Sequence, residues 1–217
     1  MSSPMARRLA AVIVTAVLAT AGCGGSTESS PPTTTTTTTT SSAASVDIEG
    51  MVVVDYPGGL HVQASQRVAY DRTPPFGGAH DGVWAACNGV VYRTAVRNEN
   101  MVHSLEHGAV WIAYDPARIA GDALAALERL VTGQPYLLLS PYPGLDRPLS
   151  LQSWGHQLKL DNADDPRLVQ FVRGLRANPA THPEPGATCD AIPGVFDPAN
   201  PPPFDPTPPG PDAVPVQ

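Results

Sequence analysis

The sequence predicts one small domain of the α/β or α+β class, in which helices pack on a mixed β-sheet. The first observation is a pair of apolar stretches, residues 109–114 and 136–139, which are bounded by prolines and therefore predict strands. The second is the segment between them, where Leu124, Leu127 and Val131 recur at helical spacing. A strand–helix–strand unit of this kind joins parallel strands.

The other strands and the long loops follow from apolar runs and turn residues. Apolar runs predict three further strands, at residues 51–54, 90–92 and 149–154. Residues 71–84 contain paired prolines and several glycines that oppose regular structure, so we expect a loop there.

Two more helices have recognisable ends. The first is expected over residues 99–107, with Asn98 as its N-cap and Gly108 as its stop. The second starts at Asp165-Pro166, because proline in the first turn of a helix costs no hydrogen bond. Its expected buried stripe consists of Leu168, Phe171, Val172 and Leu175.

Composition divides the 217 residues into four parts. Residues 1–22 are expected to be a signal peptide, and residues 23–45 a lipidated cysteine followed by a threonine-rich flexible linker. Ten of the 25 residues from 193 to 217 are proline, so we expect residues 191–217 to form a disordered tail without a core. The globular domain then spans residues 46–190, a normal size for one hydrophobic core.

The junction before Cys23 predicts where the protein is located. Arg7-Arg8 precede an apolar segment that is too short to span a bilayer as a mature helix. A cysteine directly after Ala-Gly resembles the lipobox of bacterial lipoproteins, although Thr20 stands where leucine is usual. The resemblance implies cleavage before Cys23 and a lipid anchor that holds the protein on the extracytoplasmic face of the cell membrane. The alternative is an ordinary secreted protein with a stray cysteine.

Net charge limits the classes of partner. The chain has a formal net charge of −7 and no visible basic patch. Nucleic acid is therefore not an expected partner, because binding to it depends on clustered Lys and Arg. The expected partners are the membrane, through the lipid anchor, and a component of the cell envelope.

Two cysteines remain once Cys23 is assigned to the lipid. An even pair in an oxidising compartment favours a disulfide between Cys87 and Cys189. The alternative is a pair of thiolate metal ligands, which the absence of a C-x-x-C spacing disfavours.

Histidines supply the candidate metal ligands. His103 and His107 are four residues apart, so they share one helix face and their ring nitrogens can meet one ion. Met101 adds a thioether, a soft ligand that suits copper, and either His61 or His80, which lies on the Gly/Pro-rich loop, could complete the site. Zinc is the other candidate ion. Glu106 is the nearest acceptor that could orient a ligand ring from the second coordination shell.

Two other interpretations of these residues remain open. The histidines can be structural, holding the Gly/Pro loop through hydrogen bonds to backbone in a non-catalytic envelope-binding module. Alternatively, His103, Glu106 and His107 form the H-x-x-E-H pattern of a metal-dependent hydrolase. Gly108 ends the helix directly after this pattern, which disfavours a peptidase, and on balance the sequence favours a role without catalysis.

Several short motifs occur in an order that resembles a known family. They are Pro74-Pro75-Phe76-Gly77-Gly78-Ala79-His80, Val102-His103-Ser104-Leu105-Glu106-His107-Gly108-Ala109-Val110, Tyr114-Asp115-Pro116, Ser153-Trp154-Gly155 and Pro183-Glu184-Pro185. Together they look like the bacterial domain-of-unknown-function family 3105, which occurs largely in exported and membrane-tethered proteins.

The resemblance implies a shared fold and no established activity. It puts histidines at the places of His80, His103 and His107. This chain departs from the family pattern at residues 76–79, where Thr-Ser-Gly-Pro is usual, and at His156, where arginine is more frequent. The resulting expectation is a membrane-anchored lipoprotein of unknown activity whose histidine cluster is a candidate copper or zinc site.

Overall fold

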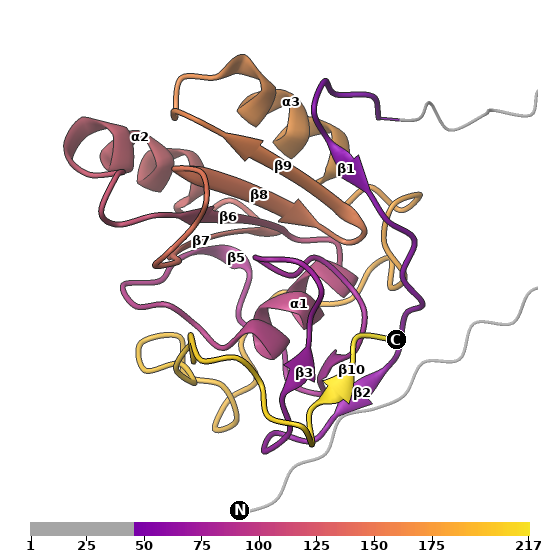
Figure 1. Ribbon diagram of the computed structural model, residues 1–217. Helices are drawn as coiled ribbons and strands as arrows, with labels where there is room; N and C mark the ends of the chain where they lie inside the picture. The colour runs from indigo at the N-terminus through magenta and orange to yellow at the C-terminus, as the bar shows by residue number, and fades with distance from the viewer. Residues whose placement is uncertain (1–45) are drawn as a thin grey trace, which may run out of the picture. The chain divides into compact units, whose positions relative to one another are not determined.

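A computed structural model describes residues 46–217 of the chain, and its main feature is a six-stranded sheet (Figure 1). The expected signal peptide, Cys23 and the threonine-rich linker lie outside these residues. The helices and strands, in chain order, are β1 (Val52–Val53), β2 (His61–Val62), β3 (Val68–Ala69), β4 (His80–Asp81), β5 (Asn88–Val91), α1 (Asn98–Glu106), β6 (Val110–Tyr114), α2 (Gly121–Val131), β7 (Leu137–Pro141), β8 (Leu149–Ser153), β9 (His156–Leu160), α3 (Pro166–Leu175) and β10 (Val214–Pro215).

The sheet is mixed, as the sequence predicts. Its strand order is β1-β9-β8-β6-β7-β5. β6 and β7 are parallel and are joined through α2, which confirms the predicted strand–helix–strand unit. β8 pairs antiparallel with both β6 and β9, and β1 pairs antiparallel with β9. Two smaller strand pairs, β2 with β4 and β3 with β10, lie outside this sheet.

Both faces of the sheet are covered, which is why every residue of β6 is buried. Val110, Ile112 and Tyr114 of this strand belong to one core cluster, which includes the apolar stripes of α2 and α3. Trp111 and Ala113 point to the opposite face and belong to a second cluster with α1. Figure 1 shows α2 and α3 on one side of the sheet and α1 on the other. The candidate ligands of α1 therefore lie in the second layer.

The helix ends agree with the predictions for α3 and differ for α1. Asp165 caps α3, since its side chain accepts a hydrogen bond from the backbone N–H of Arg167. Asn98 is the first residue of α1 rather than its cap, and the cap position is taken by Arg97, whose side chain does not cap the backbone N–H groups of the helix. The Arg97 guanidinium pairs with Asp81 and Glu99. The Arg97–Asp81 pair, rather than local capping, ties the start of α1 to β4.

One strand of the large sheet was not expected. The sequence predicts a strand that ends at Trp154, but β9 follows it after a tight turn at Gly155, which has a φ of 69°. Gln157 and Lys159 lie between the apolar residues of this strand. They interrupt the apolar run, so the sequence pattern does not predict the strand. Pairing with β8 decides its conformation.

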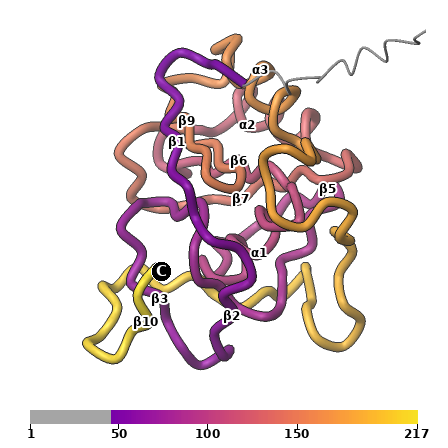
Figure 2. Tube along the Cα trace, turned by 90° about the vertical axis from the view of Figure 1, so that its right-hand side faces the viewer, coloured from indigo at the N-terminus to yellow at the C-terminus, as the bar shows by residue number. Residues whose placement is uncertain are grey.

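The proline-rich C-terminal segment is placed against the domain, whereas the sequence predicts a disordered tail at residues 191–217. Phe196 is only 3% exposed and packs in the second core cluster. The carbonyl of Pro202 accepts a hydrogen bond from the Arg97 backbone N–H, and β10 pairs with β3. Figure 2 shows the yellow C-terminal segment beside β3. Prolines lack N–H groups, but their carbonyls still accept hydrogen bonds, and the phenylalanines between them supply apolar anchors.

The predicted disulfide is confirmed. Cys87 and Cys189 are bonded, and both are buried in the core cluster that also contains part of α1. The bond ties the C-terminal segment to the strand region before α1. The thiolate alternative for these two cysteines is therefore excluded.

Among residues 46–217, no helix combines the length and the apolar character needed to cross a bilayer.

Candidate metal centre

Helix α1 carries the central ligands of the site on one face. Glu106 and His107 follow His103 by three and four residues, so each of them lies beside His103 on the helix surface, His107 as the C-cap residue. All three are buried, with at most 3% of their surface exposed. Met101 is two residues from His103 and points elsewhere: it is fully buried in the hydrophobic core cluster with Leu105. The structure thus places Met101 in the packing of the helix rather than beside the imidazoles.

A two-residue strand pair brings two more imidazoles to this face. β2 and β4 run parallel, and their register sets His61 directly opposite His80. The ring centroids of these two histidines are 4.9 Å apart, and each lies 4.8–5.0 Å from the ring of His103. His80 lies within the Gly/Pro-rich stretch, as the sequence predicts, but there it forms β4 with Asp81 rather than part of a loop, and this stretch folds toward α1. Three histidines from three elements therefore surround one point.

Backbone carbonyls fix the tautomer of the buried histidines. Nδ1 of His80, His103 and His107 lies 2.8, 2.6 and 2.7 Å from the carbonyl oxygens of Gly78, Asp81 and Thr188, respectively. A carbonyl can only accept, so each Nδ1 carries a hydrogen and donates it. In the neutral ring the lone pair is then on Nε2, which is the atom left to bind a metal.

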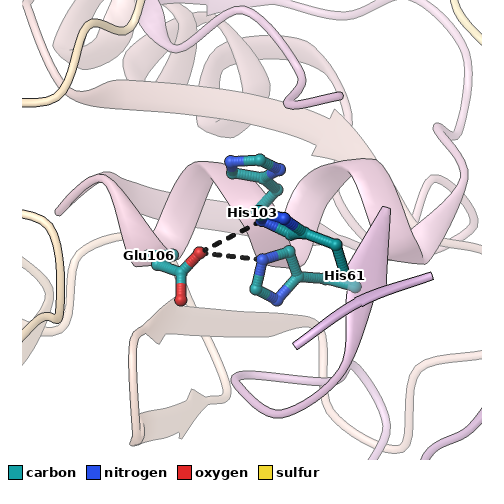
Figure 3. A group of neighbouring side chains, drawn as sticks. His61, His103 and Glu106 are labelled. Carbon is teal, nitrogen blue, oxygen red and sulfur yellow. Dashed lines mark ion pairs between the residues drawn. The ribbon is translucent and has the colours of Figure 1, made fainter. Parts of the chain in front are cut away.

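Glu106 faces these lone pairs instead of orienting a ring. Its Oε1 accepts a hydrogen bond of 2.5 Å from the backbone N–H of Gly59. Its Oε2 lies 2.8 Å from Nε2 of His80 and 3.8 Å from Nε2 of His61. Both ion pairs end on this one oxygen, as the dashed lines in Figure 3 show. We expected Glu106 as a second-shell residue, but its position is that of a direct ligand.

The His80–Glu106 contact is close but is not a hydrogen bond. The side chains are both fully buried, and neither Nε2 of His80 nor Oε2 of Glu106 has a hydrogen-bond partner among the described residues. Their separation satisfies the distance requirement, so it is the angle that fails. An imidazole nitrogen and a carboxylate oxygen this close in a buried place are unfavourable unless Nε2 carries a proton or a cation lies between the two atoms.

The pKa shifts of His103 and Glu106 favour the protonation states that bind metal. Burial lowers the pKa of His103 to about 3, helped by the neighbouring His80, His107 and His61 and opposed by the Asp81 carbonyl. The ring is therefore neutral at physiological pH, as a ligand must be. Burial also raises the pKa of Glu106, but His80 and the Gly59 N–H outweigh this effect and hold the pKa below its ordinary value. The carboxylate stays charged.

A second group of ligand atoms adjoins the first and shares His103 with it. It consists of His103, His107 and Glu184, whose ligand atoms lie within 4.8 Å of one another. Nε2 of His107 is 3.3 Å from Oε2 of Glu184. Burial lowers the pKa of His107 too, against the opposing effects of the Thr188 carbonyl and Glu184. This group explains where the predicted ligand His107 lies: it is not in the group that contains His80.

The end of α1 positions Glu184. The Glu106 carbonyl accepts hydrogen bonds from the Glu184 backbone N–H and from Nδ1 of His182. The His182 ring lies against Gly108, where an added Cβ would come within 2.6 Å of it. Gly108 also has a φ of 94°, so both the backbone and the space require glycine. The Pro183-Glu184-Pro185 motif thus packs against the helix end and presents its carboxylate to His107.

The larger group has the ligand types and spacing that can hold a metal ion. It offers three imidazole nitrogens and one carboxylate oxygen, from His61, His80, His103 and Glu106, within 4.8 Å of one another. Tetrahedral ligands at the usual zinc distances lie about 3.3 Å apart, which is between the 2.8 and 3.8 Å measured to Glu106. Small side-chain rotations would close the ligands around an ion.

The prediction from sequence is incomplete for both groups. It offers His61 only as an alternative to His80, since a two-residue strand gives no periodic signal, and it does not include Glu184, whose Pro-Glu-Pro motif is not helical. His156 belongs to neither group, and its Nδ1 bonds to the carbonyl of Trp154. The one available signal for His61 was its position beside Gly58-Gly59, where the backbone approaches Glu106 closely.

Comparison with known proteins identifies a family but no activity. The family described as "Protein of unknown function (DUF3105)" matches residues 61–191. The matched segment contains every residue of both ligand groups and both cysteines of the disulfide. No curated protein and no solved structure shows significant similarity to the chain.

Proposed function

We propose that this chain, which belongs to the DUF3105 family of proteins of unknown function, is a membrane-anchored extracytoplasmic protein that binds Zn(II) or Cu(II). The proposed ligands are Nε2 of His61, His80 and His103 and Oε2 of Glu106. The proposal replaces the sequence-based ligand set in two respects: Glu106 enters as a ligand, and Met101 leaves.

One observation carries the proposal. Nε2 of His80 and Oε2 of Glu106 face each other at 2.8 Å in a fully buried place, and neither forms a hydrogen bond within residues 46–217. Their other polar atoms are already used, by Gly78 and by Gly59. A purely structural pair would be expected to share a proton in good geometry. A metal ion between the two atoms accounts for both the proximity and the poor angle.

The donor set favours a divalent ion. Imidazole suits zinc and copper, whereas the carboxylate is a harder ligand than the thioether or thiolate that Cu(I) prefers. Met101 packs in the core, and Cys87 and Cys189 are bonded to each other, so no soft ligand joins the group. For a nitrogen and oxygen site, Cu(II) is expected to bind more tightly than Zn(II).

The location is proposed from the N-terminal sequence. The Ala-Gly-Cys23 junction supports lipidation and membrane anchoring on the extracytoplasmic face, and the disulfide is typical of an oxidising compartment. Cell fractionation of Cys23→Ala tests the anchor. The variant should leave the membrane fraction, and a mature variant that stays with the membrane like the parent would contradict lipidation.

Metal binding is tested by titrating the full chain, purified in detergent and stripped with a chelator, with Zn(II) and Cu(II). We expect one ion per chain, with affinity reduced about 100-fold or more in His80→Ala and in His103→Ala. His156→Ala is the matched control, because this histidine also donates Nδ1–H to a carbonyl but lies outside both ligand groups. Equal affinity in parent and ligand variants would show that the cluster is structural.

A further inference from the structure

We infer that residues 57–66 form a strap over the metal centre, which opens to admit the ion and then closes on the bound ion through His61. The inference rests on the proposed function and concerns what controls access to that site. The strap contains β2 and lies between two buried residues, Tyr56 and Val68. It supplies His61, the exposed member of the four-ligand group.

The other three ligands of this group are covered in the closed structure. His80 and Glu106 have fully buried side chains, and His103 is only 3% exposed. A hydrated ion has to exchange its water for these ligand atoms, so the atoms have to be uncovered before it can bind. Part of the cover therefore moves each time an ion enters or leaves the site.

The strap contacts all three covered ligands. The backbone N–H of Gly59 donates to Oε1 of Glu106 at 2.5 Å. The ring of His61 stacks on that of His103, with centroids 5.0 Å apart, and meets the ring of His80 edge to face at 4.9 Å. Figure 3 shows His61 beside His103 and Glu106. Opening of the strap would therefore uncover the ligand atoms together.

The strap is held by hydrogen bonds rather than by packing. Its residues are exposed except for the half-buried Val62, and within residues 46–217 none of them belongs to a core cluster. Besides the Gly59 bond, the Leu60 carbonyl accepts from the backbone N–H of His80, and the Gln66 carbonyl accepts from the side chain of Arg97. A segment with exposed backbone and no apolar anchor opens at a small cost in free energy.

Two tryptophans that also cover the ligands are fixed more firmly. The Trp154 ring lies 5.7 Å from that of His80 and is part of the core cluster. The Trp84 ring lies 5.5 Å from that of His103, and its indole N–H donates to the carbonyl of Asp190, next to the disulfide. The strap is therefore the part of the cover that moves at the smallest cost.

His61 links closure of the strap to the bound ion. Its Nε2 lies 3.8 Å from Oε2 of Glu106, so an ion held by Glu106 is within its reach. The bond from His61 to the ion then adds a tie that the metal-free strap lacks. The bound ion should reduce opening of the strap, and His61→Ala should remove this effect while the other three ligands still hold the ion.

Hydrogen exchange of the strap amides in the full chain tests the closing role of His61. Saturation of the parent with Zn(II) should slow exchange over residues 57–66 about tenfold. In His61→Ala, saturated with Zn(II), exchange of the same amides should stay within about threefold of its metal-free rate. Equal protection by Zn(II) in the parent and in His61→Ala, or no protection in a parent that binds Zn(II), would overturn the inference.

Gly59→Ala tests the need for opening. Gly59 has a φ of 75° and open space around an added Cβ, so alanine keeps the N–H but strains the closed backbone. Loading of Zn(II) and its release to a chelator, measured by stopped flow, should both become about fivefold faster, because the closed strap is destabilised with or without the ion. Gly144→Ala is the matched control, since Gly144 has a φ of 83° and the same open space but lies in the turn between β7 and β8.

The outcomes separate this inference from the proposed function. Parent rates in Gly59→Ala, or equal acceleration in Gly59→Ala and Gly144→Ala, would overturn the strap while the metal site itself stands. Absence of ion binding in the parent would overturn both.

Discussion

His61 and His80 stand opposite each other in a parallel strand pair that is only two residues long on each side. The pairing places a half-exposed imidazole next to a fully buried one, with Glu106 Oε2 within 4 Å of both Nε2 atoms. The two ligands should therefore contribute differently. His61→Ala should lower affinity only about tenfold, because water can replace an exposed ligand, whereas His80→Ala should lower it about 100-fold. Zn(II) titration compares them, and equal losses would contradict this assignment.

Glu106→Gln should abolish tight metal binding without destabilising the metal-free protein. Glutamine can keep the hydrogen bond from the Gly59 N–H through its carbonyl, and its amide can donate to Nε2 of His80. A new buried hydrogen bond should raise the free energy of unfolding by about 1 kcal/mol. Thermal melts in the presence of a chelator measure this change. A large loss of stability would show that Glu106 serves the fold rather than an ion.

The metal-free protein should lose stability as pH falls from about 6.5 toward 3. Burial lowers the pKa of His103 to about 3, so between these values the unfolded chain binds a proton that the folded chain does not. Each such proton makes unfolding more favourable by about 1.4 kcal/mol per pH unit as the pH decreases. Urea unfolding at several pH values measures the slope, and His103→Gln should reduce it. A pH-independent parent between 6.5 and 4 would contradict the neutral buried imidazole.

Met101 should matter for packing and not for the ion. Met101→Ala removes a fully buried side chain and should lower the free energy of unfolding by about 2–5 kcal/mol. Met101→Leu keeps the volume and should cost less than about 1.5 kcal/mol. Neither Cu(I) nor Cu(II) affinity should change in Met101→Leu. If Cu(I) affinity fell sharply in that variant, the thioether would belong to the site after all.

Removing the disulfide should affect both stability and one ligand. Cys87 and Cys189 are 102 residues apart, and a loop of that length corresponds to roughly 4–5 kcal/mol in the chain-entropy treatment. The carbonyl of Thr188, next to Cys189, orients His107. The Cys87→Ser and Cys189→Ser double variant should therefore melt at a lower temperature, with little change in Zn(II) affinity once it is folded, because His107 lies outside the group of His61, His80, His103 and Glu106. A large loss of affinity in the folded variant would show that the disulfide also supports that group.

The C-terminal strand should support the His80 loop. The backbone N–H of Ala79 donates to the carbonyl of Val216 at 2.7 Å, and β10 holds this segment beside β3. Deletion of residues 211–217 should free the loop and weaken metal binding through His80. Hydrogen exchange of the loop amides, with Zn(II) titration of the same truncated chain, checks both effects. If the truncated chain bound Zn(II) with the affinity of the parent, the C-terminal strand would not support the His80 loop.

The elements that the sequence predicts well are those with long local patterns. β6, α2, β7 and α3 have apolar periods and end signals within their own residues, and the strand pairing in the structure confirms their arrangement. Strand β9 was missed because its polar residues break the apolar run. The proline-rich segment was expected to be disordered because composition does not reveal that Phe196 has a place in the core.

The sequence by itself determined the family, the fold class, the disulfide and the common helix face of His103 and His107, because each depends on residue type and short spacing. Only the tertiary structure decided which side chains meet. His61 joins His80 through the register of β2 and β4, Glu184 reaches His107 through contacts with the end of α1, and Met101 turns into the core. These are contacts between segments far apart in the chain. Their free energy comes from packing and backbone hydrogen bonds that no local pattern encodes.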